Sequence, residues 1–171
     1  METWDAIRAR RNVREFADTP VPDGDLERIL EAGRIAPSAS NWQPWNFVLV
    51  TEREDLVSLS RVWRGAGHAA GAAAAIVVVC PIQDDPRRRE LLQYDVGQAT
   101  MSMMIAAADL GIGTGHSSIG DQELARSLLG FPEDRFAAYF FSLGYPREGS
   151  LRPLRRMNRR PFEEVVHRGR W

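Results

Sequence analysis

The sequence contains no lysine and a single cysteine, and each of these absences excludes a class of chemistry. All 22 of its basic residues are arginine, so no lysine amine can act as a nucleophile or form a Schiff base. Because Cys80 is the only cysteine, no intramolecular disulfide can form, and this cysteine usage is typical of the reducing cytoplasm. Any cation at a functional site must come from arginine or histidine.

Strong net charge and long apolar runs are also missing. The 171 residues carry a formal net charge of -1, which favours neither nucleic acid nor a membrane surface as a partner. The longest apolar stretch, residues 69–82, is shorter than the roughly 20 residues that span a bilayer, and no secretory signal is visible at the start. We therefore expect one cytoplasmic domain over residues 1–171, without membrane or nucleic acid as a partner.

Hydrophobic periodicity predicts an alternation of helices and strands. Helices are expected at residues 3–9, 23–35, 54–62, 86–110 and from 121 to 130, and strands at 47–51, 76–80 and 137–143. Trp4 and Ile7 are expected to face inward from the first helix. The second half of the longest helix is apolar nearly all round, which is typical of a helix buried in a domain or against a partner subunit. The elements lack a regular βαβ order, so we predict an α+β fold that ends in an irregular, arginine-rich segment from Tyr145.

Two arginine-rich segments lie near opposite ends of the sequence. The N-terminal cluster consists of Arg10, Arg11, Asn12 and Arg14, and the C-terminal pair of Arg159 and Arg160. Planar guanidinium groups with a small polar donor hold a phosphate well. Basic residues are also common on solvated helix ends, so the N-terminal cluster by itself leaves both interpretations open.

A polar loop follows the second predicted helix. This tryptophan loop, residues 37–45, contains Ser38, Ser40, Asn41 and Gln43 together with two tryptophans and two prolines. Hydroxyl and amide groups pair with the donor and acceptor edge of an imide-like ring. A capped turn whose side chains bond the local backbone is the alternative. Together with the arginine segments, the loop favours a bound mononucleotide.

The order of these motifs resembles the nitroreductase family of flavin mononucleotide (FMN) enzymes. The resemblance rests on Arg-Arg-Asn-Val-Arg-x-Phe at 10–16, Ala-Pro-Ser-Ala-Ser-Asn-Trp-Gln-Pro-Trp-Asn-Phe at 36–47, Ala-Ala-Ala-Asp-Leu-Gly-Ile-Gly-Thr at 106–114 and Arg-Arg-Pro-Phe-Glu-Glu-Val-Val-His at 159–167. It covers nearly the whole chain. It implies a nitroreductase-like fold, with a central mixed, mainly antiparallel sheet surrounded by helices, in a homodimer that holds FMN at the subunit interface.

The resemblance also implies which residues bind the phosphate and the ribityl chain. Arg10, Arg11 and Asn12 correspond to the segment that does so in the family, and Arg14 to a basic residue beside the same cofactor. Asn12 stands where serine is usual. Arg159 corresponds to a C-terminal arginine that binds the phosphate, with its neighbour in the C-terminal pair, Arg160, as the alternative.

The flavin ring is expected to have partners in the tryptophan loop and after the longest helix. Pro37, Ser38 and Asn41 correspond to residues that reach the ring from the second subunit, while Gln43 matches as a contact or as a structural support. Flavin N5 usually meets a backbone N–H in the loop after the long helix, here residues 114–120. The nearest residues in that loop are Ser117, Ser118 and Ile119.

The N1 and O2 edge of the flavin becomes negative on reduction, so a cation or donor is expected there. Relatives often use a lysine, which this chain lacks. His68 and Arg64 are the nearest substitutes, and we favour His68. The alternative for His68 is a histidine that is simply packed against a helix.

Two other motifs point away from competing cofactors. The run Gly111-Ile-Gly-Thr-Gly115 resembles a dinucleotide-binding loop only superficially, because its glycines are misplaced and it follows a helix rather than a strand. His68, His116 and His167 show no metal-ligand spacing, so we expect no metal.

The resemblance implies an FMN-dependent oxidoreductase. Hydride would pass from NAD(P)H to the flavin and then to an electron-poor acceptor such as a nitroaromatic or a quinone. The flavin carries this chemistry, so no protein acid or base is assigned. Two alternatives stay open: a family specialist in flavin fragmentation, reductive dehalogenation or dehydrogenation, and a flavin-binding or sensing protein without turnover.

Overall fold

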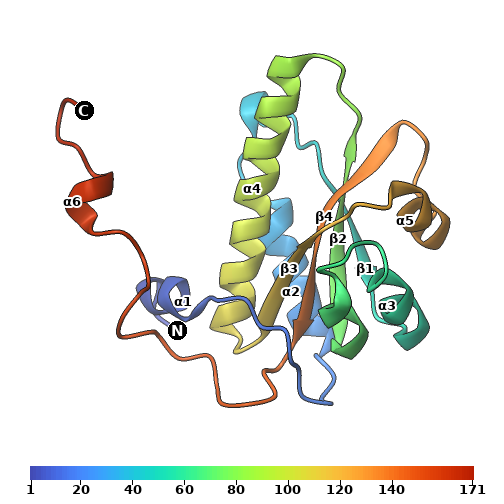
Figure 1. The fold of residues 1–171 in the computed structure, drawn as a ribbon, viewed down its shortest axis with the longest axis horizontal. Coiled ribbons are helices and arrows are strands. Elements are labelled where there is room, and N and C mark those ends of the chain that lie inside the picture. The colour runs from blue at the N-terminus through green and yellow to red at the C-terminus, as the bar shows by residue number, and fades with distance from the viewer.

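A four-stranded sheet with helices on both faces forms the centre of the molecule (Figure 1). The computed structural model describes all 171 residues. The helices are α1 (Thr3–Ala9), α2 (Asp23–Arg34), α3 (Arg53–Leu59), α4 (Pro86–Asp109), α5 (Gln122–Leu129) and α6 (Phe162–Val165), with short 3-10 helices η1 (Ala39–Asn41) and η2 (Gly67–Gly71). The strands are β1 (Asn46–Val50), β2 (Ala74–Pro81), β3 (Gly113–Ser118) and β4 (Arg135–Gly144).

The strands lie in the order β1-β2-β4-β3, and every neighbouring pair is antiparallel. On the free edge of β3, a single parallel bridge joins Asn12 to Thr114. The sheet is therefore antiparallel with one parallel addition. This arrangement confirms the predicted α+β class and the mixed, mainly antiparallel sheet.

Strand β2 is the central, fully enclosed strand. Residues from Ala74 to Cys80 are all buried, because α2 and α4 cover one face of the sheet while α3 and α5 cover the other. Burial on both faces explains why this strand reads as a continuous apolar run rather than as an alternation. The same burial raises the pKa of the Cys80 thiol to about 12, so this cysteine is an inert part of the core.

Helix α4 is the longest helix of the layer on its face of the sheet. Its sequence defines both its start and its packing. Pro86 occupies the first turn, and the Asp85 carboxylate accepts a hydrogen bond from the Arg88 amide at 2.8 Å, which satisfies a free donor of the helix end. Helix α2 packs across α4 at Gly33. A Cβ at this position would lie 2.6 Å from the sulfur of Met103, so glycine permits the two helices to approach.

Most of the predicted elements are present, but two expectations are wrong. Residues 114–118 belong to strand β3 and do not form a loop. Trp4 and Ile7 do not face inward, since they are 67% and 39% exposed. Helix α1 instead packs through its small residues, Ala6 and Ala9, because a short helix lying close to α4 has room only for methyl groups.

The chain after β4 is irregular, as predicted, apart from the four-residue helix α6. Its first part is attached to the body: Leu151 packs with Ala9 and Ala108, and the Leu154 amide donates to the Arg8 carbonyl at 3.3 Å. Residues 155–171, here called the arm, then extend beyond α1 (Figure 1). No helix of the structure has the length and apolar character needed to cross a bilayer.

Candidate cofactor-binding site

The N-terminal cluster is held in place by a close backbone contact with β3. The Val13 amide donates to the Thr114 carbonyl at 2.8 Å. A Cβ at Gly115 would lie 2.4 Å from the Val13 carbonyl oxygen, and one at Gly113 would lie 2.7 Å from the Val13 side chain. Only glycine fits beneath Val13 at this separation, so the glycine-rich run serves to seat the N-terminal segment.

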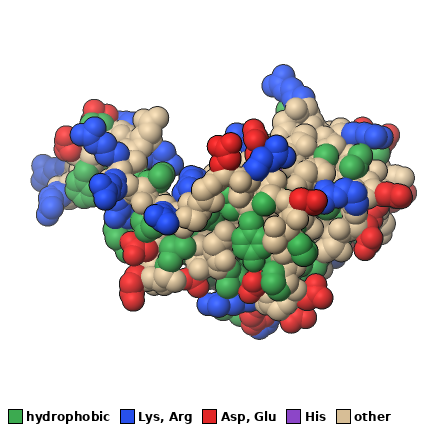
Figure 2. Space-filling model, turned by 90° about the horizontal axis from the view of Figure 1, so that it is seen from below, with side chains coloured by type: hydrophobic (Ala, Val, Ile, Leu, Met, Phe, Trp, Pro, Cys, Tyr) green, Lys and Arg blue, Asp and Glu red, His purple; other side chains and the backbone are tan.

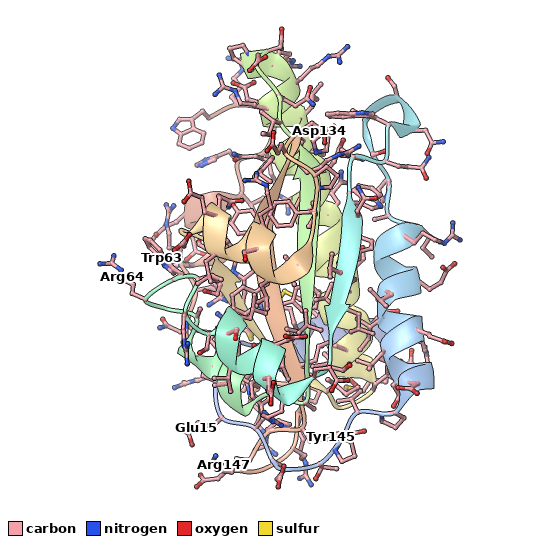
Figure 3. The ribbon with its side chains drawn as sticks, turned by 90° about the vertical axis from the view of Figure 1, so that its right-hand side faces the viewer. Glu15, Trp63, Arg64, Asp134, Tyr145 and Arg147 are labelled. Carbon is pink, nitrogen blue, oxygen red and sulfur yellow. The ribbon has the colours of Figure 1, made fainter.

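A second attachment follows a few residues later. Phe16 is buried over Gly144, where an added Cβ would lie 2.8 Å from its ring. The Ala17 amide donates to the Tyr145 carbonyl at 2.8 Å, and the Arg147 amide donates to the Glu15 carbonyl at 3.0 Å. Figure 3 shows the side chains of Glu15 and Arg147 together at the lower edge of the molecule. Residues 10–14 are therefore fixed along the edge of the sheet.

Between this segment and α4 lies a cavity of about 430 Å³. Its walls come from four elements of the fold and consist of Arg10, Asn12, Gln93, Val96, Gly97, Thr100, Met101, Met104, His116 and Tyr139. The volume is within the range of small-molecule and cofactor sites. The lining combines apolar side chains with a guanidinium, amides and an imidazole, which suits a ligand with an aromatic body and an anionic end.

Several polar groups of the cavity have no partner within the chain. The side chains of Arg10 and Asn12 form no hydrogen bond or ion pair there. The Thr100 hydroxyl is buried and also lacks a partner. Buried polar groups in folded proteins are almost always hydrogen-bonded. A cavity lined by an unpaired hydroxyl and an unpaired guanidinium therefore fits a bound polar ligand, and FMN meets that requirement with its phosphate and ribityl hydroxyls.

The structure places His116 and His68 on opposite faces of the sheet. His116 lines the cavity and lies against Tyr139, with their ring centroids 5.2 Å apart. His68 is buried on the α3 side, where its Nδ1 lies 2.8 Å from the Ser142 hydroxyl and its ring contacts Phe140. Burial lowers the pKa of both histidines below the usual value, and the positive charge of Arg14 lowers that of His68 further.

Within one chain, neither candidate for the N1 and O2 edge of the flavin lines the cavity. His68 is separated from it by β3, and its Nε2 is buried without a partner. Arg64 is exposed, with its guanidinium carbon 5.3 Å from the centre of the Trp63 ring. Figure 3 shows Arg64 pointing away from the body. A role for either residue at the flavin stays a prediction.

The tryptophan loop borders a second hollow that continues from the cavity. This groove of about 640 Å³ runs along α4 past Pro37 and shares Gln93, Gly97 and Met101 with the cavity. The loop is fixed to α4 by the buried Asp95, whose carboxylate oxygens accept from the Ala39 amide at 3.1 and 3.2 Å. Of the predicted loop residues, Pro37 therefore lies next to the candidate site.

Inside the tryptophan loop, the other predicted residues support its shape. The Ser38 hydroxyl accepts from the Gln43 amide at 2.9 Å, and the Gln43 side chain donates to the Asn41 carbonyl at 3.1 Å. Ser40, Asn41 and Gln43 all adopt positive φ angles, which is uncommon for residues other than glycine. Ser38 and Gln43 thus hold a strained turn, and Asn41 remains exposed.

The remaining predicted residues of the N-terminal cluster face away from the cavity. The Arg11 guanidinium donates to the carbonyls of Ala9, Ser150 and Arg152 at 3.1 to 3.3 Å, so it fastens the chain before the arm to α1. Arg14 is exposed and borders a separate polar hollow of about 460 Å³. Arg10 and Asn12 are therefore the two members of the cluster that line the cavity.

The three residues expected near flavin N5 lie at the end of β3. Ser117 is buried and its hydroxyl donates to the Ser118 carbonyl at 3.1 Å. Ser118 is exposed, whereas Ile119 is buried in the core on the α3 side. None of the three lines the cavity in one chain. Sequence reasoning missed His116, Thr100 and Tyr139, which do. Thr100 carries a usable signal, since it is a polar residue on the buried surface of an apolar helix.

The C-terminal pair does not meet Arg10 within one chain. The Arg159 guanidinium donates to the Asn158 carbonyl at 2.6 Å, and Arg160 bonds to Glu164 within the arm. The arm extends beyond α1 (Figure 1), so the predicted convergence of arginines from both ends on one phosphate is not seen within one chain.

Comparisons with known proteins agree with the fold and identify the family. A sequence model described as "Nitroreductase family" matches residues 7–66 and 60–145. A putative NADH dehydrogenase/NAD(P)H nitroreductase of Archaeoglobus fulgidus is 33% identical, over 96% of each chain.

Solved structures show the same fold. A putative NADH oxidase of Clostridium acetobutylicum superposes with a TM-score of 0.84 at 24% identity, covering 98% of this chain and 100% of the other. An FMN-dependent nitroreductase of Clostridium difficile superposes with a TM-score of 0.83 at 23% identity, covering 97% and 98%. The predictions of family, fold and enzyme class are confirmed: the chain belongs to the nitroreductase family and is an oxidoreductase of that family's type.

Proposed function

We propose that this protein is an FMN-dependent oxidoreductase that passes hydride from NAD(P)H to electron-poor acceptors such as nitroaromatics and quinones. The observation that carries the proposal is the cavity beside α4. There the free Arg10 guanidinium and the residue Thr100, whose buried hydroxyl has no partner, line the same cavity as the apolar Met104. The names of two similar proteins, a putative NADH dehydrogenase/NAD(P)H nitroreductase and an FMN-dependent nitroreductase, support the same function.

The residues of the cavity would divide the work of holding FMN. Arg10 and Asn12 would bind anionic and polar oxygens, because a guanidinium forms strong charge-assisted hydrogen bonds with phosphate. Val96, Met101 and Met104 would cover apolar surface and exclude water. The bound flavin would supply the hydride chemistry, while the protein positions it and adjusts its electrostatic surroundings.

The proposal includes a homodimer, for which the arm gives the clearest support. Phe162, Val165 and Trp171 are 68%, 53% and 101% exposed in one chain. Figure 2, a view from below, shows arginine side chains around hydrophobic atoms on the protruding lobe that contains the arm. Exposed apolar residues on an extended terminus are typical of a segment that packs on a partner. A second copy would cover them and bring the C-terminal pair to a cofactor at the interface.

Titration with FMN tests the cofactor directly. Purified protein is expected to bind FMN and turn yellow, and the bound flavin should bleach within seconds when NADH or NADPH is added without oxygen. Subsequent addition of a nitroaromatic or a quinone should restore the colour. Failure of the wild-type protein to retain FMN would contradict the proposal. Retention without bleaching by any donor would leave a flavin-binding or sensing protein as the better description.

A pair of arginine variants locates the binding site. Arg10→Ala removes an unpaired guanidinium from the cavity and should weaken FMN about 10- to 100-fold, as expected for the loss of a charge-assisted hydrogen bond. Arg87→Ala removes the same charge from an exposed side chain on α4 that pairs only with Glu90. It serves as the control and should leave the dissociation constant for FMN within about twofold.

Product analysis separates the general reductase from a family specialist. Nitroaromatic and quinone reduction by NAD(P)H should account for the electrons consumed under nitrogen. Loss of the flavin itself or release of halide would favour fragmentation or dehalogenation instead. We also propose a cytoplasmic location, which the single buried cysteine supports.

A further inference from the structure

A histidine that the sequence did not single out for the cofactor lines the candidate cavity. We infer that His116 is a contact of the bound phosphate-bearing cofactor and that it takes up a proton when the cofactor binds. The inference rests on the proposed function, because FMN is the anion that it invokes. It goes further by naming another contact residue and by linking cofactor binding to proton uptake.

The position of His116 suits this role. It lies near the middle of edge strand β3, and its ring forms part of the cavity wall together with Arg10 and Thr100. The Tyr139 ring packs against it, with the ring centroids 5.2 Å apart and the ring planes tilted by 32°, which restricts the movement of the imidazole. Neither of its ring nitrogens has a hydrogen-bond partner in the chain. They are not among the fully buried unpaired atoms either, so His116 can exchange a proton with solvent.

The charges around His116 favour the neutral form until an anion arrives. Arg10 is the charged residue of the cavity wall, and no carboxylate lines the cavity. On the other face of β3, His68 lies close enough for the two histidines to repel each other when charged, and Arg14 adds positive charge there. From α4 the cavity receives only uncharged side chains, and from β4 the Tyr139 ring. Burial lowers the pKa of His116 further.

An anion in the same cavity reverses this balance. A nearby negative charge favours the protonated form of a histidine and raises its pKa. A dianionic phosphate carries about two negative charges near neutral pH, since its second pKa is about 6. The guanidinium of Arg10 neutralises only part of that charge, and no second guanidinium lines the cavity within one chain. Proton uptake by His116 would add to the positive charge of Arg10 and of the C-terminal pair that a second copy is proposed to bring.

His68 cannot take this proton by the same route. Its Nδ1 is engaged with the Ser142 hydroxyl, its ring is buried against Phe140, and β3 separates it from the cavity. The third histidine, His167, lies on the exposed arm. The three histidines are thus in three different surroundings, and their signals can be told apart.

Calorimetry measures the proton directly. Titrations of wild-type protein with FMN at about pH 7.5, where its phosphate is already dianionic, are compared in two buffers of different ionisation enthalpy. We expect uptake of a substantial fraction of one proton for each FMN bound. Above this pH the affinity should fall by up to about tenfold per pH unit. Riboflavin, which lacks the phosphate, should bind with less uptake.

Histidine-selective NMR on the wild-type holoprotein assigns the proton without a mutation. The His116 signal should titrate at a higher pH with FMN bound than without it. His116→Gln keeps a polar side chain and should remove the proton uptake and flatten the pH dependence of FMN affinity. His167→Gln, the matched control, should keep both.

The outcomes distinguish this inference from the proposed function. If FMN binds without proton uptake, or if the signal of His68 or His167 moves in place of that of His116, the role of His116 is wrong while the proposed function stands. If FMN does not bind to the wild-type protein, both fail. Proton uptake that persists unchanged in His116→Gln would likewise exclude His116.

Discussion

The two ends of the chain differ in how far contacts within one copy fix them. The N-terminal segment is fully packed: Val13 is hydrogen-bonded to Thr114 and seated over Gly113 and Gly115. The arm has apolar side chains that nothing in one chain covers, and its C-terminal pair forms hydrogen bonds only within the arm. One chain therefore builds the wall of the candidate cavity, while the proposed second phosphate contact depends on a partner.

The largest effect is expected from adding a methyl group in β3, beneath the packed N-terminal segment. Gly115→Ala would place a Cβ 2.4 Å from the Val13 carbonyl oxygen, so the segment that carries Arg10 must move. We expect a loss of about 1–3 kcal/mol in the free energy of unfolding together with a clear loss of FMN affinity. Urea unfolding and FMN titration measure the two effects.

A matched substitution controls for the loss of glycine itself. Gly24→Ala adds a methyl group in α2 where no atom lies within 4 Å, and it should leave the stability unchanged or raise it by up to about 1 kcal/mol. Equal stability of Gly115→Ala and the wild-type protein would show that the close seating of Val13 is unimportant.

Making the apolar surface of the arm polar tests its proposed contact with a partner. Replacing Phe162 and Val165 together with serine should convert the proposed dimer to monomers and weaken FMN, because the arm would no longer bring its arginines to the partner. Sedimentation velocity gives the oligomeric state. Glu163→Ser, an exposed change on the same short helix, should leave the dimer intact. A wild-type protein that sediments as a monomer would remove the basis of the comparison.

A smaller effect tests whether the buried hydroxyl of the cavity wall lacks a partner in the free protein. Thr100→Val removes the buried hydroxyl that has no partner and nearly preserves its shape. The free protein should become more stable by about 1–2 kcal/mol, since a buried unpaired group is lost, while FMN affinity falls. Thermal unfolding with and without FMN separates the two. A stability that falls in the free protein would mean that the hydroxyl already has a partner, such as water.

The smallest effect concerns acid. The pKa of His68 is lowered in the folded protein, first by burial and then by Arg14 and His116, so the unfolded chain binds more protons. Stability should therefore fall as the pH drops below about 6.5, the ordinary histidine value, by at most about 1.4 kcal/mol per pH unit for each such group. His116 contributes with the same sign. Urea unfolding of His68→Gln should show a shallower decline than the wild-type protein between about pH 6.5 and 5.

Local sequence signals were sufficient for most of the fold. Asp121 and Gly130 were predicted to begin and close a helix. The structure shows the Asp121 carboxylate accepting from the Leu124 amide and Gly130 in the left-handed conformation. Residues 76–80 were predicted as a strand, and they lie within β2. These signals depend on neighbours in the sequence, so they can be read from one chain alone.

Signals that depend on distant segments were missed. Strand β3 has no apolar alternation, because Gly113 and Gly115 are selected by the approach of Val13 from the other end of the chain. His116 was considered only for metal spacing, and nothing local indicates that it would lie in the same cavity as Arg10 and Thr100. The site is formed by tertiary contacts, and for the arm the sequence can only point to a partner.

The buried thiol of Cys80 has a practical consequence for studying the arm. Because its pKa is raised to about 12 and β2 is enclosed on both faces, maleimide reagents at neutral pH find almost no reactive thiolate in the native protein. A cysteine introduced at the exposed Glu163 would then be the single labelled position. A spin label or fluorophore there could report the distance between two arms in solution without removal of the natural cysteine.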